Sequence, residues 1–108
     1  MFVLQPKPTF KFDVTIPAAG DSANGTIKFE FKHMGRKALK AYYETLGSGD
    51  TARADVDALG DLIVGWSGVD TAYSGEALEQ LLDGFPGAAT AIFEGFNKGL
   101  FEGKQKNS

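Results

Sequence analysis

Two segments near the start of the chain alternate apolar and polar residues with a period of two. Residues 10–16 read FKFDVTI and residues 27–31 read IKFEF. Such alternation is typical of β-strands that bury one face. The residues between them include the turn formers Pro17, Gly20, Asp21, Asn24 and Gly25. The pattern therefore predicts an antiparallel β-hairpin over residues 9–32.

An isolated hairpin is marginally stable in water, so the predicted sheet needs a cover. Helices on its apolar face or strands from another chain would supply one. Its two edges also carry backbone groups that can pair with another strand. We therefore expect a homo-oligomer, weakened by proline at Thr15 or Lys28 where that residue's amide faces an edge.

Beyond Gly35 the apolar period changes from two to about 3.6, which is typical of amphipathic helices. A first helix is predicted from there to about Gly47, and a third from the N-cap residue Ser74 to Gly84. A fourth begins near Pro86. The second helix is predicted from an apolar stripe of Val56, Leu59, Leu62, Ile63 and Trp66, which places Trp66 at its end.

These elements predict an α+β fold, with an N-terminal antiparallel β-hairpin followed by about four α-helices packed on it. Residues 35–102 form the helical part and residues 103–108 a flexible tail. The 108 residues fit one domain, 1–108. Gly65 and Gly68 allow a sharp turn after Trp66, which would bring Val69 back onto the core. Trp66, Val69 and Leu82 are interpreted as structural anchors.

Composition excludes several classes of function. The chain has no cysteine and one histidine, which removes thiolate nucleophiles, disulfides and multi-histidine metal sites. Its net charge of −3 gives no general attraction to nucleic acid or anionic lipid. Apolar runs such as Leu62–Val64 are far below the roughly 20 residues of a membrane span. Residues 1–8 lack the apolar stretch of a secretory signal, so we expect a cytoplasmic protein.

The remaining candidates for chemistry favour ordinary structural explanations. The acidic residues do not match a calcium-loop pattern, and we interpret them as a solvent-facing group: Asp50, Asp55, Asp57, Asp61 and Asp70. His33 follows the second strand without a partner at catalytic spacing. No complete phosphate-binding loop is present. We therefore expect no enzyme activity, no cofactor and no metal.

Aromatic residues on the two predicted strands could form a base-stacking platform or a sheet core. The residues are Phe10, Phe12, Phe29 and Phe31. The lysines on these strands, Lys11 and Lys28, fall on the opposite face, and the chain is acidic. This arrangement favours the sheet core.

Small residues form a ridge along the fourth predicted helix, beside its aromatic stripe. Gly95 and Gly99 together cost about 2 kcal/mol of helix propensity, unless a neighbour uses the space that they leave. One interpretation is a docked partner helix contacting Ala91, Gly95, Gly99 and the outward-facing Phe101. If the ridge faces solvent in the free protein, as this interpretation requires, Gly95→Ala should raise stability by up to ~1 kcal/mol. The other is internal packing against the first or second helix.

The order of motifs along the chain resembles the tail assembly chaperones of long-tailed bacteriophages and prophages. The resemblance spans nearly the whole chain and rests on Gly65–Asp70, Tyr73–Ser74, Leu78, Leu81–Leu82, Pro86, Ala91–Ile92 and Lys106–Asn107. It implies a non-catalytic chaperone, in the cytoplasm of the host bacterium, that binds the tape measure protein and yields to the tail tube protein. The alternative is a small structural or tail-completion protein retained in the virion.

Overall fold

The computed structural model describes residues 1–103 and shows an α+β fold, as predicted. Strands β1 (Thr9–Ile16) and β2 (Gly25–Lys32) form an antiparallel hairpin in which Phe10 faces Phe31 and Val14 faces Ile27. Four α-helices follow: α1 (Arg36–Thr45), α2 (Asp55–Gly60), α3 (Gly75–Gly84) and α4 (Ala88–Glu102). The predicted tail, apart from Gly103, lies outside the described residues.

A third strand, β3 (Ile63–Ser67), corrects the prediction for the second helix. Helix α2 ends at Gly60, and the chain turns through Asp61 and Leu62 before pairing with β2. Ile63, Val64 and Trp66 are β-branched or aromatic residues, which favour strands. Trp66 therefore lies in a strand opposite Phe29, not at the end of a helix.

The strand order β1-β2-β3 makes β2 the central strand. Lys28, opposite Ser67 of β3, is therefore not at an edge, and a proline there would disrupt the sheet itself. This corrects the expectation for Lys28. Among the strands of the described residues, β1 and β3 are the edge strands.

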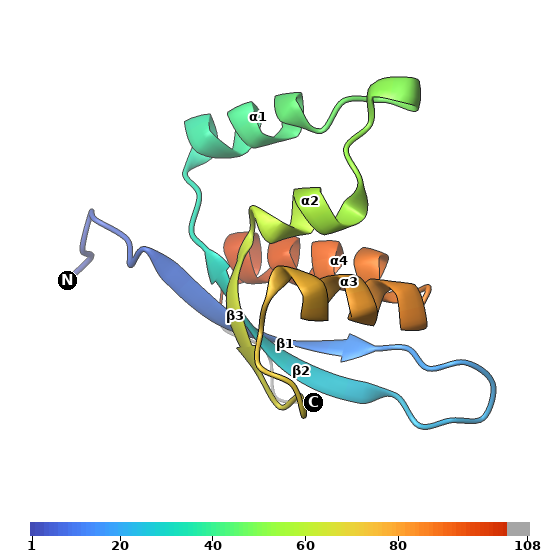
Figure 1. The fold of residues 1–108 in the computed structure, drawn as a ribbon. Helices are drawn as coiled ribbons and strands as arrows, with labels where there is room; N and C mark the ends of the chain where they lie inside the picture. Colours follow the sequence, from blue (N-terminus) through green and yellow to red (C-terminus); the bar gives the residue numbers. More distant parts are fainter. Residues whose placement is uncertain (104–108) are drawn as a thin grey trace.

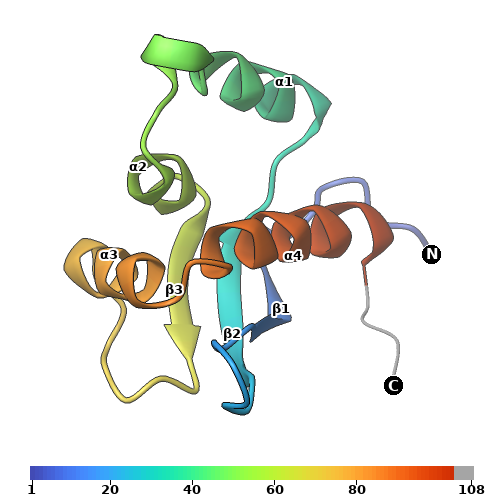
Figure 2. The ribbon, with the colours of Figure 1, turned by 90° about the vertical axis from the view of Figure 1, so that its right-hand side faces the viewer.

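The helices form a layer on one face of the sheet, with α4 over β1 and α3 beside it (Figures 1 and 2). The buried core lies between the two layers. Phe29 and Phe31 of β2 and Ile92 and Phe96 of α4 are at most 1% exposed. Phe31 meets Phe96 edge to face, with ring centroids 5.5 Å apart. The interpretation of the strand aromatics as a sheet core is confirmed.

Helix α1 lies farther from the sheet, beyond α2 and α4 (Figure 2). Two tyrosines connect it to the rest of the fold. The buried Tyr42 hydroxyl donates a 2.7 Å hydrogen bond to the carbonyl oxygen of Ala58 in α2. The Tyr43 hydroxyl donates a 3.0 Å hydrogen bond to Oδ1 of Asn97 in α4. Between α1 and α2 the chain forms a short 3-10 helix, Gly49–Thr51.

Helix α3 begins as its sequence predicted. The Ser74 hydroxyl accepts a 3.0 Å hydrogen bond from the backbone N–H of Ala77, which is an N-cap interaction. Helix α4 starts at Ala88, two residues after Pro86, with Gly87 as its N-cap.

We predict that Tyr42→Phe destabilises the protein by about 1 kcal/mol, because the Ala58 carbonyl loses its side-chain donor in a buried site. Urea denaturation at pH 7 measures the change. Tyr43→Phe is the matched control, since its hydrogen bond is exposed and should contribute less. An equal loss in both variants would contradict a special role for the buried hydroxyl.

Burial also raises the pKa of Tyr42, from 10.0 to about 12. The unfolded chain releases this proton at lower pH than the folded protein does. The stability from a neutral Tyr42 is therefore complete below pH 10 and is lost as the pH rises through about 12. We expect stability to fall more steeply over this interval in the natural protein than in Tyr42→Phe. Unfolding curves at successive pH values measure this difference. If the expectation is wrong, the natural protein and Tyr42→Phe will lose stability in parallel as the pH rises.

Candidate functional site

The small-residue ridge of α4 faces β1 inside the protein. Gly95 and Gly99 are both buried. A Cβ added to Gly95 would lie 2.5 Å from Cγ2 of Val14, and one added to Gly99 would lie 2.5 Å from Cε2 of Phe10. The glycines thus let the helix approach the strand closely.

This packing contradicts a solvent-facing ridge and fits the internal alternative, although the neighbour is a strand and not a helix. A partner helix could reach Gly95 and Gly99 only by displacing β1. Ala91 is half-buried beside them. Of the four residues predicted for partner binding, only Phe101 is exposed, at 69%. The structure therefore does not bring these four residues together on an open surface.

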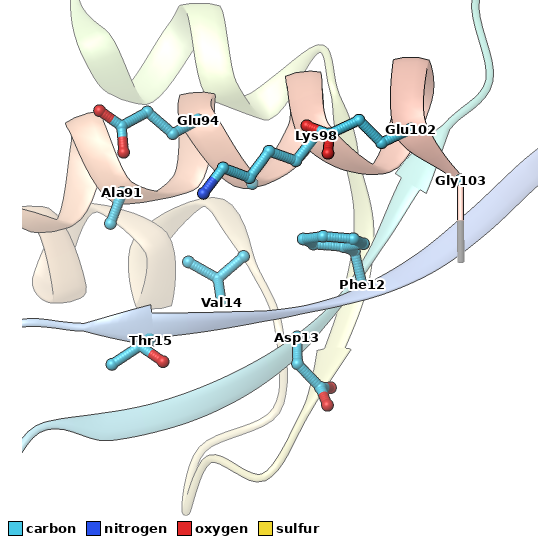
Figure 3. Close-up of a pocket in the computed structure, with 10 residues that line it drawn as sticks. Phe12, Asp13, Val14, Thr15, Ala91, Glu94, Lys98, Glu102 and Gly103 are labelled. Atoms are coloured by element: carbon cyan, nitrogen blue, oxygen red, sulfur yellow. The ribbon is translucent and has the colours of Figure 1, made fainter. Parts of the chain in front are cut away.

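A cleft follows the outer edge of β1 beneath α4. Figure 3 shows Phe12 and Val14 pointing toward the helix and Ala91 pointing toward the strand. Glu94, Lys98 and Glu102 of α4 also line the cleft. It therefore has apolar walls and a charged rim. Asp13 lines it from the strand, and its carboxylate lies 3.9 Å from Nζ of Lys28.

A second, more apolar groove lies around Phe85, between the end of α3 and the far end of the hairpin. Two adjoining hollows share Val69, Asp70, Leu81 and Phe85, and we call them together the Phe85 groove. Asp70 is the only charged residue among those that line it. The other lining residues are Ile16, Ala18, Ala23, Gly25, Thr26, Ile27, Trp66, Gly68, Thr71, Ala77, Gln80 and Gly84.

The Trp66 side chain lines this groove and is held in place by three contacts. Its Nε1–H donates a 2.8 Å hydrogen bond to the carbonyl oxygen of Thr71. Its ring packs edge to face on Tyr73 and on Phe29, with centroid distances of 5.1 and 6.0 Å. Gly68, at φ +86°, provides the turn that follows. These contacts give the groove a rigid wall.

Val69 and Leu82 are half-buried and pack against the core. Sequence patterns singled out Val69 and Trp66 for packing, but missed that both border an open groove. They also missed Phe85, which is 41% exposed although it ends an amphipathic helix. The signal available in the sequence was a large aromatic residue, Phe85, directly after Gly84, the predicted end of the helix.

The polar candidates are dispersed. All five aspartates considered above are exposed, Asp61 forms a 2.7 Å ion pair with Arg53, and Asp70 accepts a hydrogen bond from Thr71. His33 is half-buried, and its backbone N–H donates to the Pro8 carbonyl. Within residues 1–103, no three His, Cys, Asp or Glu side chains gather as a metal site would require. None of the described helices is long and apolar enough to cross a membrane.

Comparison with known families decides the classification. A family model described as phage tail assembly chaperone matches residues 1–107. The chain belongs to this family. The resemblance inferred from the sequence is thereby confirmed, and with it a general role in phage tail assembly. No curated protein and no solved structure is significantly similar to the chain. The Phe85 groove and the cleft beside β1 are the two surfaces of this chaperone considered below for partner binding.

We predict that Gly95→Ala destabilises the protein by about 1 kcal/mol. The methyl group would gain about 1 kcal/mol of helix propensity but would overpack against Val14, at a typical cost of 1–3 kcal/mol. Val14 is buried and β-branched, so it cannot easily rotate away. Thermal denaturation measures the net effect.

Gly75→Ala is the matched control for this prediction. Gly75 also lies in a helix, and a Cβ there would meet nothing within 4 Å. This variant should be as stable as the natural protein or slightly more stable. A stabilised Gly95→Ala variant would show that α4 does not pack on β1 as described.

Proposed function

We propose that this chaperone binds the tape measure protein non-catalytically and holds it until tail tube subunits replace it. The family assignment over residues 1–107 supports a role in tail assembly. The Phe85 groove supports the binding mode, because it is open, apolar and bordered by the fixed Trp66. Amphipathic helices commonly dock in such grooves through a few apolar side chains.

The proposed contact places apolar side chains of a tape measure helix between Phe85, Val69 and Leu81. Phe85 is already 41% exposed in the free protein, so binding requires no unfolding. Asp70 at the rim would accept a hydrogen bond from the partner or form an ion pair with a basic side chain of it. Each contact is small, which suits a chaperone that must later release its client.

The family assignment also supports a host cytoplasmic location, because tails assemble in the infected cell. Phe101 remains a proposed second contact on α4. It is separated in sequence from the groove and is the most exposed aromatic residue after Phe2. The two surfaces can be tested in parallel.

We predict that Phe85→Asp lowers co-purification of the co-expressed tape measure protein at least tenfold and leaves more of it insoluble. A charge in the groove would have to be desolvated on binding, at a cost above the 1.4 kcal/mol that a tenfold change represents. Because Phe85 is partly exposed, the variant should keep its fold, which circular dichroism checks. Pull-down from matched cultures measures the effect.

Val64→Asp is the matched control, since Val64 is similarly exposed, at 46%, but does not line the groove. Phe101→Asp tests the second contact. Normal recovery of the tape measure protein with Phe85→Asp would reject the groove. Recovery of this protein in stoichiometric amounts from purified virions would favour the structural alternative.

A further inference from the structure

The first eight residues form an exposed apolar arm ahead of β1. Met1, Phe2, Val3 and Leu4 are each at least 72% exposed, and residues 1–8 contain no helix or strand. Figure 1 shows this arm extending beyond the start of β1, away from the helical layer. It contains one charged side chain, Lys7, and no acidic residue. Four consecutive apolar side chains in water are an unusual feature unless a partner covers them.

The arm has the features of a short pairing strand. Phe2 and Val3 favour extended structure, and Phe2, Val3 and Leu4 each have a backbone N–H that can pair. Pro6 and Pro8 lack one, so a strand formed by the arm would end near Gln5.

The outer edge of β1 can receive such a strand. The His33 N–H donates to the Pro8 carbonyl, which identifies these opposed residues as a hydrogen-bonded pair. Because hydrogen-bonded and non-hydrogen-bonded pairs alternate in antiparallel sheets, even-numbered residues of β1 bond to β2. The backbones of Lys11 and Thr15 therefore point outward. Thr15 lies at the cleft beneath α4.

The β1 edge is also more regular than the other edge. Strand β1 pairs with β2 over eight residues without a register shift. Strand β3 has five residues, and its pairing is interrupted by a shift between Glu30 and Phe31. A continuous edge offers the better template for strand addition.

The composition of the cleft complements that of the arm. Phe12, Val14 and Ala91 give an apolar surface for one face of an added strand (Figure 3). Glu94 and Glu102 outnumber Lys98 on the helical rim, which favours a basic occupant. The arm is apolar and carries Lys7, so it matches the cleft in both respects.

We propose that residues 2–5 of one copy add as a strand to β1 of a second copy, in the cleft beneath α4. Each copy has one arm and one β1 edge, so two copies can exchange arms reciprocally, or the contact can continue from copy to copy. This inference does not rest on tape measure binding, because the Phe85 groove uses different residues. Self-association can therefore fail or succeed independently of the proposed function.

Light scattering on the purified protein over a range of concentrations tests the proposal. We expect concentration-dependent oligomers, and at least a tenfold higher concentration for half-assembly in the Val3→Asp/Leu4→Asp double variant. Thr15→Pro should raise the concentration for half-assembly in the same way. It alters the β1 strand that receives the arm and removes an N–H that points outward. Val64→Asp, on β3, is the control and should assemble normally. A monomer at all concentrations, or normal assembly of the double variant, would overturn the proposal.

Disulfide trapping provides a test that does not depend on the proline variant folding. The sequence has no cysteine, so any disulfide that forms must join the introduced cysteines. Chains carrying Val3→Cys or Leu4→Cys are mixed separately with chains carrying Thr15→Cys under a mild oxidant. Successive side chains of a strand lie on opposite faces, so only one of the two arm positions should form the mixed dimer efficiently.

Three other trapping outcomes would overturn the proposal. The first is equal trapping at both arm positions, which would indicate unspecific contact. The second is preferential trapping with Gln80→Cys, which would place the arm in the Phe85 groove. A single chain carrying both cysteines that closes on itself, at a rate independent of concentration, would show that the arm folds back on its own β1.

Discussion

The close packing of α4 on β1 is the contact on which the rest of the structure depends. A sheet with one apolar face must cover it, and α4 covers the aromatic residues of β1 and β2. Two glycines in the middle of a helix cost about 2 kcal/mol of propensity. That cost is offset because Gly95 and Gly99 let the helix axis come close to Val14 and Phe10. With larger residues the helix would stand away from the sheet and leave the core poorly filled.

This packing also determines which surfaces stay open. Since α4 uses its small residues internally, its remaining side chains form the charged rim above the β1 edge. At the other end of the layer, α3 ends at Gly84, and Phe85 is left half in water beside Trp66 and Val69. The protein therefore offers an apolar groove and a strand edge in separate places. The two surfaces share no lining residue.

Local patterns predicted most of the fold. Strict alternation located β1 and β2, and Ser74 and Gly84 located the ends of α3. The third strand was missed because the stripe Val56, Leu59, Leu62, Ile63 and Trp66 satisfies a helical period by coincidence. The Ile63–Trp66 part is as consistent with a short buried strand, and periodicity alone does not separate the two. The β-branched and aromatic side chains of Ile63, Val64 and Trp66 were the signal in the sequence that favoured a strand.

The candidate site was harder to predict, because it depends on contacts between distant segments. A glycine ridge on a helix looks the same in sequence whether it faces a partner or a strand of its own chain. Only the positions of Val14 and Phe10 decide the matter. The Phe85 groove likewise combines α3, the turn after β3 and the far end of the hairpin, which no local pattern connects.

The proposed use of these surfaces has a consequence for affinity. Fully burying one phenylalanine contributes about 1.5–3 kcal/mol, and Phe85 is already more than half covered in the free protein. A single groove can therefore hold a client only weakly. If copies also join through the arm and the β1 edge, many weak grooves would face one long client, and their combined binding would be strong. Release would then follow from separating the copies, without any single tight contact having to break.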